Sequence, residues 1–227
     1  MRCLGLFAKY WQPGRVKSRL AESIGAAPAA DLYRTFLATL ISRLADSADR
    51  RVLAYTPEEH HDPFHQLLAE TAPERWTLES QPAGDLGARM RYFFDTAFAA
   101  GASRVVLIGS DSPNVPVPFI DQAFVALERA PVVLGPTTDG GYYLVGAREA
   151  TPPIFDEIAW SSPSVWQQTV DRLDALSITY RSLPRWYDVD DLADLHRLAD
   201  DLSRGADSRP ALKPLRDGVE RALRTRA

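Results

Sequence analysis

The 227-residue chain predicts an α/β protein with three layers, α/β/α, built on a mainly parallel mixed sheet of Rossmann-like type. Three observations predict this class. Short apolar runs alternate with helical patterns almost from end to end. The run Val105–Ile108 is continuously apolar, which is typical of a strand covered by helices on both faces. Unusual polar residues fall just after the predicted strands, where open α/β sheets bind their ligands.

Each element follows from the local pattern of apolar residues. The predicted strands are Arg2–Ala8, Arg51–Thr56, Trp76–Gln81, Arg104–Gly109, Val132–Gly135, Tyr142–Gly146 and Ile178–Leu183. The predicted helices are Val16–Ile24, Ala29–Ala45, Pro63–Glu70, Leu86–Ala100, Pro118–Arg129, Ser164–Leu176 and Leu192–Leu202. The stretch from Pro136 to Leu144 predicts a hairpin, because Asp-Gly between two strands is a strong turn signal.

Composition and charge narrow the classes of protein. No Gly/Ser- or Pro-rich linker divides the chain before about Ser203, so we expect one domain over residues 1–227, with a helical tail over 203–227. A net charge of -4 argues against nucleic-acid partners. The single cysteine, Cys3, lies in an apolar strand and predicts a packing role in a reducing compartment. With no signal peptide and no apolar stretch long enough for a membrane, we expect a cytoplasmic protein without a membrane partner.

Four cations near the beginning of the chain form the first candidate site. Lys9 ends the first strand, and Arg15, Lys17 and Arg19 follow a Pro-Gly turn where a helix begins. The positive end of the helix dipole normally favours anions at such a position. A bound polyanion would explain the cations, because backbone N–H groups and positive side chains would converge on it. We therefore expect a di- or triphosphate here; the alternative is a basic turn exposed to water.

Two aspartates are expected to hold a divalent cation. Asp111 follows the most apolar strand, and Asp190 lies in the Asp-Val-Asp segment after the last one. Mg²⁺ or Mn²⁺ is commonly held by one or two carboxylates together with phosphate oxygens. Asp188 is the substitute for Asp190, because alternate residues of an extended chain face the same side. The alternatives are a turn role for Asp111 and a helix cap at Asp190 or Asp191.

Two further segments predict contacts with the organic parts of the substrates. A loop running into a helix is expected to bind a base or ribose against its backbone, although a plain strand-to-helix turn also explains this pattern. Its nucleotide-binding candidates are Gln81, Gly84, Asp85, Leu86 and Gly87. Asp139 is expected to contact an acceptor hydroxyl as a base or hydrogen-bond acceptor. The acceptor-binding candidates beside it are Gly140, Gly141, Tyr142, Trp160 and Ser161.

Taken together, the motifs resemble a bacterial family of nucleotide-diphospho-sugar transferase-like proteins with the GT-A fold. Members are often labelled radical-SAM/selenodomain-associated transferases or arsenosugar-biosynthesis glycosyltransferases. The matching segments are Phe7–Lys9, Pro13–Leu20, Gly84–Gly87, Gly109–Pro113, Asp139–Leu144 and Asp188–Asp190. The resemblance reaches to about Leu202 and implies glycosyl transfer. Lys9 with Lys17–Leu20 is also similar to the phosphate loop of the phospholactate guanylyltransferases, which implies nucleotidyl transfer.

Three functions stay open at this level. The first is a metal-dependent glycosyltransferase with a nucleotide-diphospho-sugar donor, a small-molecule acceptor, and Asp111, Asp139 and Asp190 as catalytic residues. The second is a nucleotidyltransferase that moves a nucleoside monophosphate from a triphosphate to a phosphorylated acceptor and releases pyrophosphate. The third is a non-catalytic nucleotide-binding domain, which acids at both metal positions disfavour. The sequence specifies neither the base, the sugar and the acceptor nor the oligomeric state.

Overall fold

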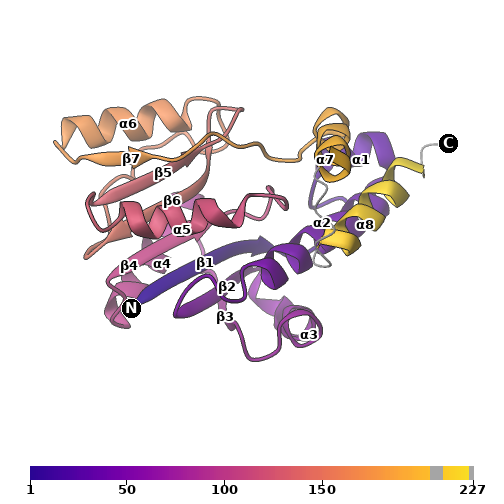
Figure 1. Ribbon diagram of the computed structural model, residues 1–227, viewed down its shortest axis with the longest axis horizontal. Helices are drawn as coiled ribbons and strands as arrows, with labels where there is room; N and C mark the ends of the chain where they lie inside the picture. The colour runs from indigo at the N-terminus through magenta and orange to yellow at the C-terminus, as the bar shows by residue number, and fades with distance from the viewer. Residues whose placement is uncertain (205–211, 225–227) are drawn as a thin grey trace.

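The computed structural model describes residues 1–204 and 212–224, and in that part of the chain seven strands form one sheet (Figure 1). Their order across the sheet is β3-β2-β1-β4-β6-β5-β7. The strands are β1 (Arg2–Lys9), β2 (Arg50–Thr56), β3 (Thr77–Ser80), β4 (Arg104–Ile108), β5 (Val132–Pro136), β6 (Tyr142–Arg148) and β7 (Tyr180–Ser182). β6 runs antiparallel to β4 and β5, and the other neighbouring pairs are parallel. The predicted mixed, mainly parallel sheet is confirmed.

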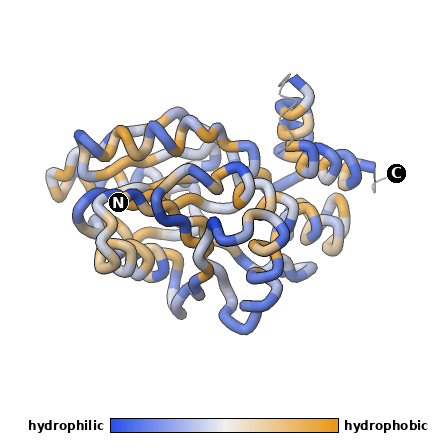
Figure 2. Tube along the Cα trace, turned by 60° about the horizontal axis from the view of Figure 1, so that its bottom comes forward, coloured by the Kyte–Doolittle hydropathy of each residue, from blue (hydrophilic) through white to orange (hydrophobic). Residues whose placement is uncertain are grey.

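Helices cover both faces of the sheet. They are α1 (Ser18–Ile24), α2 (Ala26–Arg43), α3 (His61–Thr71), α4 (Leu86–Ala99), α5 (Val117–Ala126), α6 (Val165–Ala175), α7 (Leu192–Arg204) and α8 (Lys213–Arg224), with a short 3₁₀ turn, η1 (Glu58–His60). α4 and α6 pack on one face, and the other helices contribute to the core on the opposite face. Hydrophilic and hydrophobic stretches alternate along the outer helices in Figure 2, as expected for helices with one buried side. The three-layer prediction is confirmed.

Alternation along the central strands divides the core in two. Val106 and Ile108 face the layer that contains α2, whereas Val105 and Leu107 face α4 and α6. Cys3 is fully buried in the second of these cores. The Cys3 side chain therefore packs in the apolar core, as the sequence predicts, and its burial raises the pKa of the thiol to about 11.

The chain ends in helices that pack beside α2. Figure 1 shows α1, α7 and α8 gathered around α2, and these helices contact one another. α8 occupies Lys213–Arg224 of the predicted tail, while residues 205–211 and 225–227 lie outside the described residues. No helix within the described residues is both long enough and apolar enough to cross a bilayer.

Several predicted boundaries differ from the structure by a few residues, and two of these differences have a visible local cause. The first helix was expected to begin at Val16 but begins at Ser18, because Lys17 adopts a left-handed conformation with φ 48° and ψ 46°. That conformation costs an ordinary residue about 1 kcal/mol or more and cannot continue a right-handed helix. The last strand is shorter than predicted, because its pairing with β5 covers only three residues, Tyr180–Ser182.

Candidate active site

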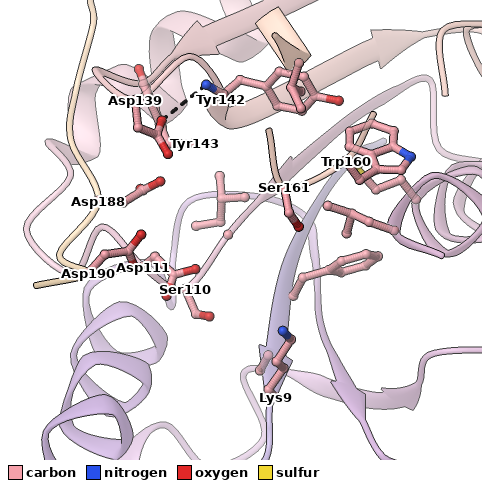
Figure 3. A pocket seen from close by; sticks show the side chains of 18 of the residues that line it. Lys9, Ser110, Asp111, Asp139, Tyr142, Tyr143, Trp160, Ser161, Asp188 and Asp190 are labelled. Atoms are coloured by element: carbon pink, nitrogen blue, oxygen red, sulfur yellow. Dashed lines mark hydrogen bonds between the residues drawn. The ribbon is translucent and has the colours of Figure 1, made fainter. Parts of the chain in front are cut away.

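A cavity of about 950 Å³ lies at the edge of the sheet where β1 and β4 end and β6 begins. Figure 3 shows Asp111, Asp139, Asp188 and Asp190 along one side of it, with Trp160 opposite. The predicted site residues that line this cavity are Lys9, Arg15, Lys17, Arg19, Gln81, Gly84, Leu86, Asp111, Asp139, Gly141, Tyr142, Trp160, Ser161 and Asp190. Asp85, Gly87 and Gly140 are not among its lining residues. Most of the predicted site residues therefore lie together outside the carboxyl ends of the strands, where open α/β sheets bind their ligands.

Two cations and two acids of the cavity meet in one group, which we call the charged corner: Lys17, Arg19, Asp111 and Asp190. The Lys17 ammonium donates to Asp111 Oδ1 and, at 3.0 Å, to Asp190 Oδ1, a residue 173 positions away. Arg19 donates to the other oxygen of Asp190 at 2.6 Å. The predicted phosphate ligands and the predicted metal ligands are thus in direct contact.

Lys17 is the buried centre of the charged corner. Its side chain is only 3% exposed, and its Nζ lies 5.9 Å and 5.8 Å from the ring centroids of Tyr33 and Phe36. Burial alone would lower the pKa of Lys17, but Asp111 and Asp190 outweigh burial and hold that pKa above its ordinary value. The side chain is therefore a fixed positive charge at physiological pH.

The segment that carries Asp190 is extended and tied to the Asp111 loop. The Val189 N–H donates to the carbonyl oxygen of Asp111 at 2.9 Å, and the Val189 side chain is buried on the side away from the cavity. Asp188 and Asp190 both face the cavity, as their spacing predicts. Burial raises the pKa of Asp188 to about 7, and Ser112 Oγ donates to its carboxylate at 2.6 Å.

The capping role that competed with metal binding belongs to Asp191. Its Oδ1 accepts from the backbone N–H groups of Ala193 at 2.9 Å and Asp194 at 3.0 Å, at the start of α7. Asp194 in turn accepts from the N–H groups of Asp190 and Asp191. Asp191 satisfies the helix terminus, and the Asp190 side chain remains in the cavity.

Asp139 is held at the tip of the β5–β6 hairpin. The Gly141 N–H donates to its Oδ1 at 3.2 Å (Figure 3), and Thr137 Oγ1 donates to the same oxygen. Its Oδ2 has no hydrogen-bond partner within the residues that the structure describes. This arrangement fixes the carboxylate and leaves one oxygen available to a ligand.

Opposite the aspartates lies a surface that we call the aromatic wall, made of Tyr142, Trp160 and Ser161. The rings of Tyr142 and Trp160 meet edge to face, with centroids 6.3 Å apart.

Two glycines position the aromatic wall although neither of them lines the cavity. A Cβ on Gly87 would lie 2.3 Å from the Phe155 carbonyl oxygen and 2.8 Å from Trp160 Nε1. A Cβ on Gly140, whose φ is +93°, would lie 2.1 Å from the Pro163 carbonyl oxygen.

Two nucleotide-binding candidates have a visible structural role. Asp85 accepts from the Ala88 N–H at 2.8 Å and caps α4. Gln81 lines the cavity, and its side-chain amide donates to the Ala54 carbonyl oxygen at 2.6 Å. A strand-to-helix turn with a capping residue thus accounts for Asp85. Nucleotide contact remains a prediction for the rest of that loop.

The structure adds residues that the sequence patterns did not select. Tyr33 lines the cavity, shares a hydrogen bond of 2.7 Å with Ser110 Oγ, and accepts from the Lys9 N–H at 3.1 Å. Tyr33 lies within the apolar periodicity of α2, which assigns it to the core, so no local signal marks it. Ser110 directly precedes Asp111, and that adjacency was the signal available for it.

The donor set of the charged corner fits a divalent cation. Oxygens of Asp111 and Asp190 converge on one positive group, the Lys17 ammonium, so both carboxylates point toward a single position with the charge for a cation. Within the described residues, no group of three or more His, Cys, Asp or Glu side chains is arranged to hold a metal ion. A site with two carboxylates suits Mg²⁺ or Mn²⁺ when substrate phosphates and waters supply the remaining ligands.

Fold and cavity together define an α/β protein with nucleotide-diphospho-sugar transferase-like architecture. The chain is similar to a protein from Desulfovibrio desulfuricans G20 described as a "putative nucleotide-diphospho-sugar transferase", with 33% identity and a TM-score of 0.87. The match covers 99% of this chain and 97% of that one. The chain belongs to the bacterial family described as "uncharacterized protein conserved in bacteria (DUF2064)", whose model matches residues 39–162. The resemblance inferred from the motifs is confirmed.

More distant structures share the fold alone. A 4-diphosphocytidyl-2C-methyl-D-erythritol synthase from Anaerococcus prevotii DSM 20548 is 11% identical, with a TM-score of 0.58 over 89% of this chain and 99% of that one. An inositol-1-phosphate CTP transferase from T. maritima is 12% identical, with a TM-score of 0.54 over 88% and 96%. No curated protein sequence matches the chain.

Proposed function

We propose that this protein is a metal-dependent transferase that moves a glycosyl group from a nucleotide-diphospho-sugar to a small-molecule acceptor. The observation that carries the proposal is the contact of Lys17 with both Asp111 and Asp190 inside one large cavity. Cations and acids that share one cavity suit a ligand whose negative charge is bound on one side by side chains and on the other by a metal. The 33% identical relative supports the nucleotide-diphospho-sugar as donor.

Two of the four predicted phosphate-binding cations are available to the donor diphosphate. Lys9 and Arg15 line the cavity and make no ion pair within residues 1–204 and 212–224. We assign them, with Arg19, to the phosphate oxygens, where they would stabilise the charge that develops on the departing nucleotide. When bound between Asp111 and Asp190, Mg²⁺ or Mn²⁺ would add to the same stabilisation.

Asp139 and the aromatic wall are assigned to the acceptor. The free Oδ2 of Asp139 can accept a hydrogen bond from an acceptor hydroxyl and orient it, while Thr137 and Gly141 hold the other oxygen. Tyr142 and Trp160 offer aromatic surface for the body of the acceptor. We place this activity in one cytoplasmic domain spanning residues 1–227.

Nucleotidyl transfer is the second candidate. Five basic side chains line the cavity, those of Lys9, Arg15, Lys17, Arg19 and Arg89, and this number suits a triphosphate at least as well as a diphosphate. A phosphorylated acceptor would then attack the α-phosphate of a nucleoside triphosphate, and pyrophosphate would leave. This reaction needs the same charged corner as glycosyl transfer. The two reactions are therefore distinguished by their products, a nucleoside diphosphate or pyrophosphate.

The test is a thermal-shift panel of nucleotide sugars and nucleoside triphosphates, with and without Mn²⁺ or Mg²⁺. We expect a nucleotide-diphospho-sugar plus metal to raise the melting temperature, and the best ligand to yield a free nucleoside diphosphate with an acceptor or with water. Pyrophosphate release from a triphosphate would establish the second reaction instead. Binding without turnover, unchanged in Asp111→Asn, would indicate a non-catalytic nucleotide-binding domain. A panel without any metal-dependent shift would contradict the proposal.

A further inference from the structure

The ammonium of Lys17 stands where a divalent cation would have to bind. Of the 26 basic residues only three are lysines, Lys9, Lys17 and Lys213, and two of these line the cavity. An ammonium is a compact, point-like charge that fits between two carboxylates, whereas the planar guanidinium of arginine does not replace it there. Among the positive side chains of this protein, a lysine is therefore the closest substitute for a metal ion.

We propose that Lys17 holds the cation position between Asp111 and Asp190 until a phosphate of the nucleotide draws its ammonium away, so that this carboxylate pair binds a divalent cation only together with the nucleotide. The inference rests on the proposed function, because it requires a phosphate-bearing ligand in this cavity.

The Lys17 ammonium and a divalent cation cannot bind at the same time, because both need the same two carboxylate oxygens. Lys17 uses Oδ1 of Asp111 and Oδ1 of Asp190 at the same time. Mg²⁺ contacts its oxygen ligands at about 2.0–2.1 Å. An ammonium in hydrogen-bond contact with the same two oxygens would then repel the ion at close range, so the two cations compete for one position.

Lys17 does not leave this position without a replacement anion. Its side chain is 3% exposed, and the rings of Tyr33 and Phe36 lie beside the ammonium. If it left alone, Asp111 would lose its cation while Asp190 would keep only Arg19, and Asp188 lies nearby in the same cavity. The free enzyme therefore keeps Lys17 in place and binds metal weakly.

A phosphate changes this balance in two ways. It offers the ammonium an anion of higher charge within the same cavity, next to Lys9 and Arg15. It also supplies the oxygen ligands that a two-carboxylate site lacks. Lys17 is the N-cap residue of α1, so its side chain leaves the backbone at the start of that helix.

The first experiment uses Mn²⁺ alone, followed by electron paramagnetic resonance and calorimetry on the full-length protein. We expect Lys17→Met to bind Mn²⁺ about tenfold more tightly than the wild type, a typical size for coupling between two ligands. Lys9→Met removes the same charge from the same cavity without touching either carboxylate, and it should leave Mn²⁺ affinity within about twofold of the wild type. Equal affinity of the wild type and Lys17→Met would overturn the inference.

The second experiment needs no variant and therefore does not depend on how Lys17→Met folds. Lysine-selective ¹³C and ¹⁵N labelling gives three side-chain signals, and inorganic pyrophosphate without metal is the probe. We expect pyrophosphate to shift the signals of both Lys9 and Lys17. A shift of Lys9 with an unchanged Lys17 would overturn the inference while leaving phosphate binding in the cavity intact. If neither signal moves and the nucleotide panel is also negative, the proposed function fails together with the inference.

Discussion

The charged corner and the aromatic wall face each other across one cavity, but they are held in place by different forces. The charged corner is held by ion pairs between segments that are distant in the chain, such as Lys17 with Asp190. The aromatic wall is held by close packing, because Gly87 and Gly140 let backbone and ring approach where no Cβ would fit. The corner is thus specified by charge and the wall by shape, and substitutions should separate the two.

The largest effect is expected from Asp111→Asn, which removes one carboxylate from the charged corner while keeping its shape. Lys17 keeps its contact with Asp190, so we expect the protein to fold. Activity, measured as kcat/KM with the substrates that the panel identifies, should fall by about 10²–10³-fold, the usual size for loss of one charge-stabilising group. Asp121→Asn on the exposed side of α5 is the matched control and should leave kcat/KM unchanged. Full activity of Asp111→Asn would show that the corner is not the reaction centre.

Gly87→Ala tests the aromatic wall and should have an intermediate effect. Alanine favours helices over glycine by about 1 kcal/mol, so on propensity alone the change would stabilise α4. The new Cβ would instead meet the Phe155 carbonyl oxygen at 2.3 Å. We expect the free energy of unfolding to fall by about 1–3 kcal/mol, as for overpacked sites. Acceptor KM should rise, while nucleotide affinity changes little.

The control for Gly87→Ala is Gly109→Ala. A Cβ at Gly109 would meet nothing within 4 Å, so chemical denaturation should show little change in stability. Equal stability losses in the two variants would mean that close approach at Gly87 is not what positions Trp160.

The smallest effect is expected from Tyr33→Phe, which alters the support of the charged corner without removing a charge. The substitution leaves Ser110 Oγ and the Lys9 N–H without their shared partner, and the ring beside Lys17 remains. We expect a loss of about 1–2 kcal/mol in the free energy of unfolding and a weaker effect on kcat/KM than that of Asp111→Asn. Tyr92→Phe, at an exposed position of α4, should change neither quantity.

Most of the fold and much of the site could be predicted, for a physical reason that both share. Apolar runs such as Val105–Ile108 mark strands directly, and parallel strands place the residues that follow them at one edge. Lys9 ends a strand at this edge, Asp111 and Asp139 each follow one, and all three therefore line the same cavity. The spacing of Asp188 and Asp190 could likewise be interpreted from strand geometry alone.

What could not be predicted depends on distances between separate segments. The cations were expected to face a phosphate, and nothing local to Lys17 indicates that its ammonium lies against Asp111 and Asp190. Nor does the helical pattern of Leu86–Ala99 show that Gly87 touches a loop more than 60 positions later. A single sequence records which residues are unusual but not how closely two loops approach.

The separation of 173 positions between Lys17 and Asp190 has a consequence for how the protein is made. On the ribosome Lys17 emerges 173 residues before Asp190. All seven strands precede Asp190 in the chain, so the sheet can form before this ion pair exists. A product truncated between Ser182 and Asp190 would contain all seven strands of the sheet but would lack the Asp190 partner of Lys17.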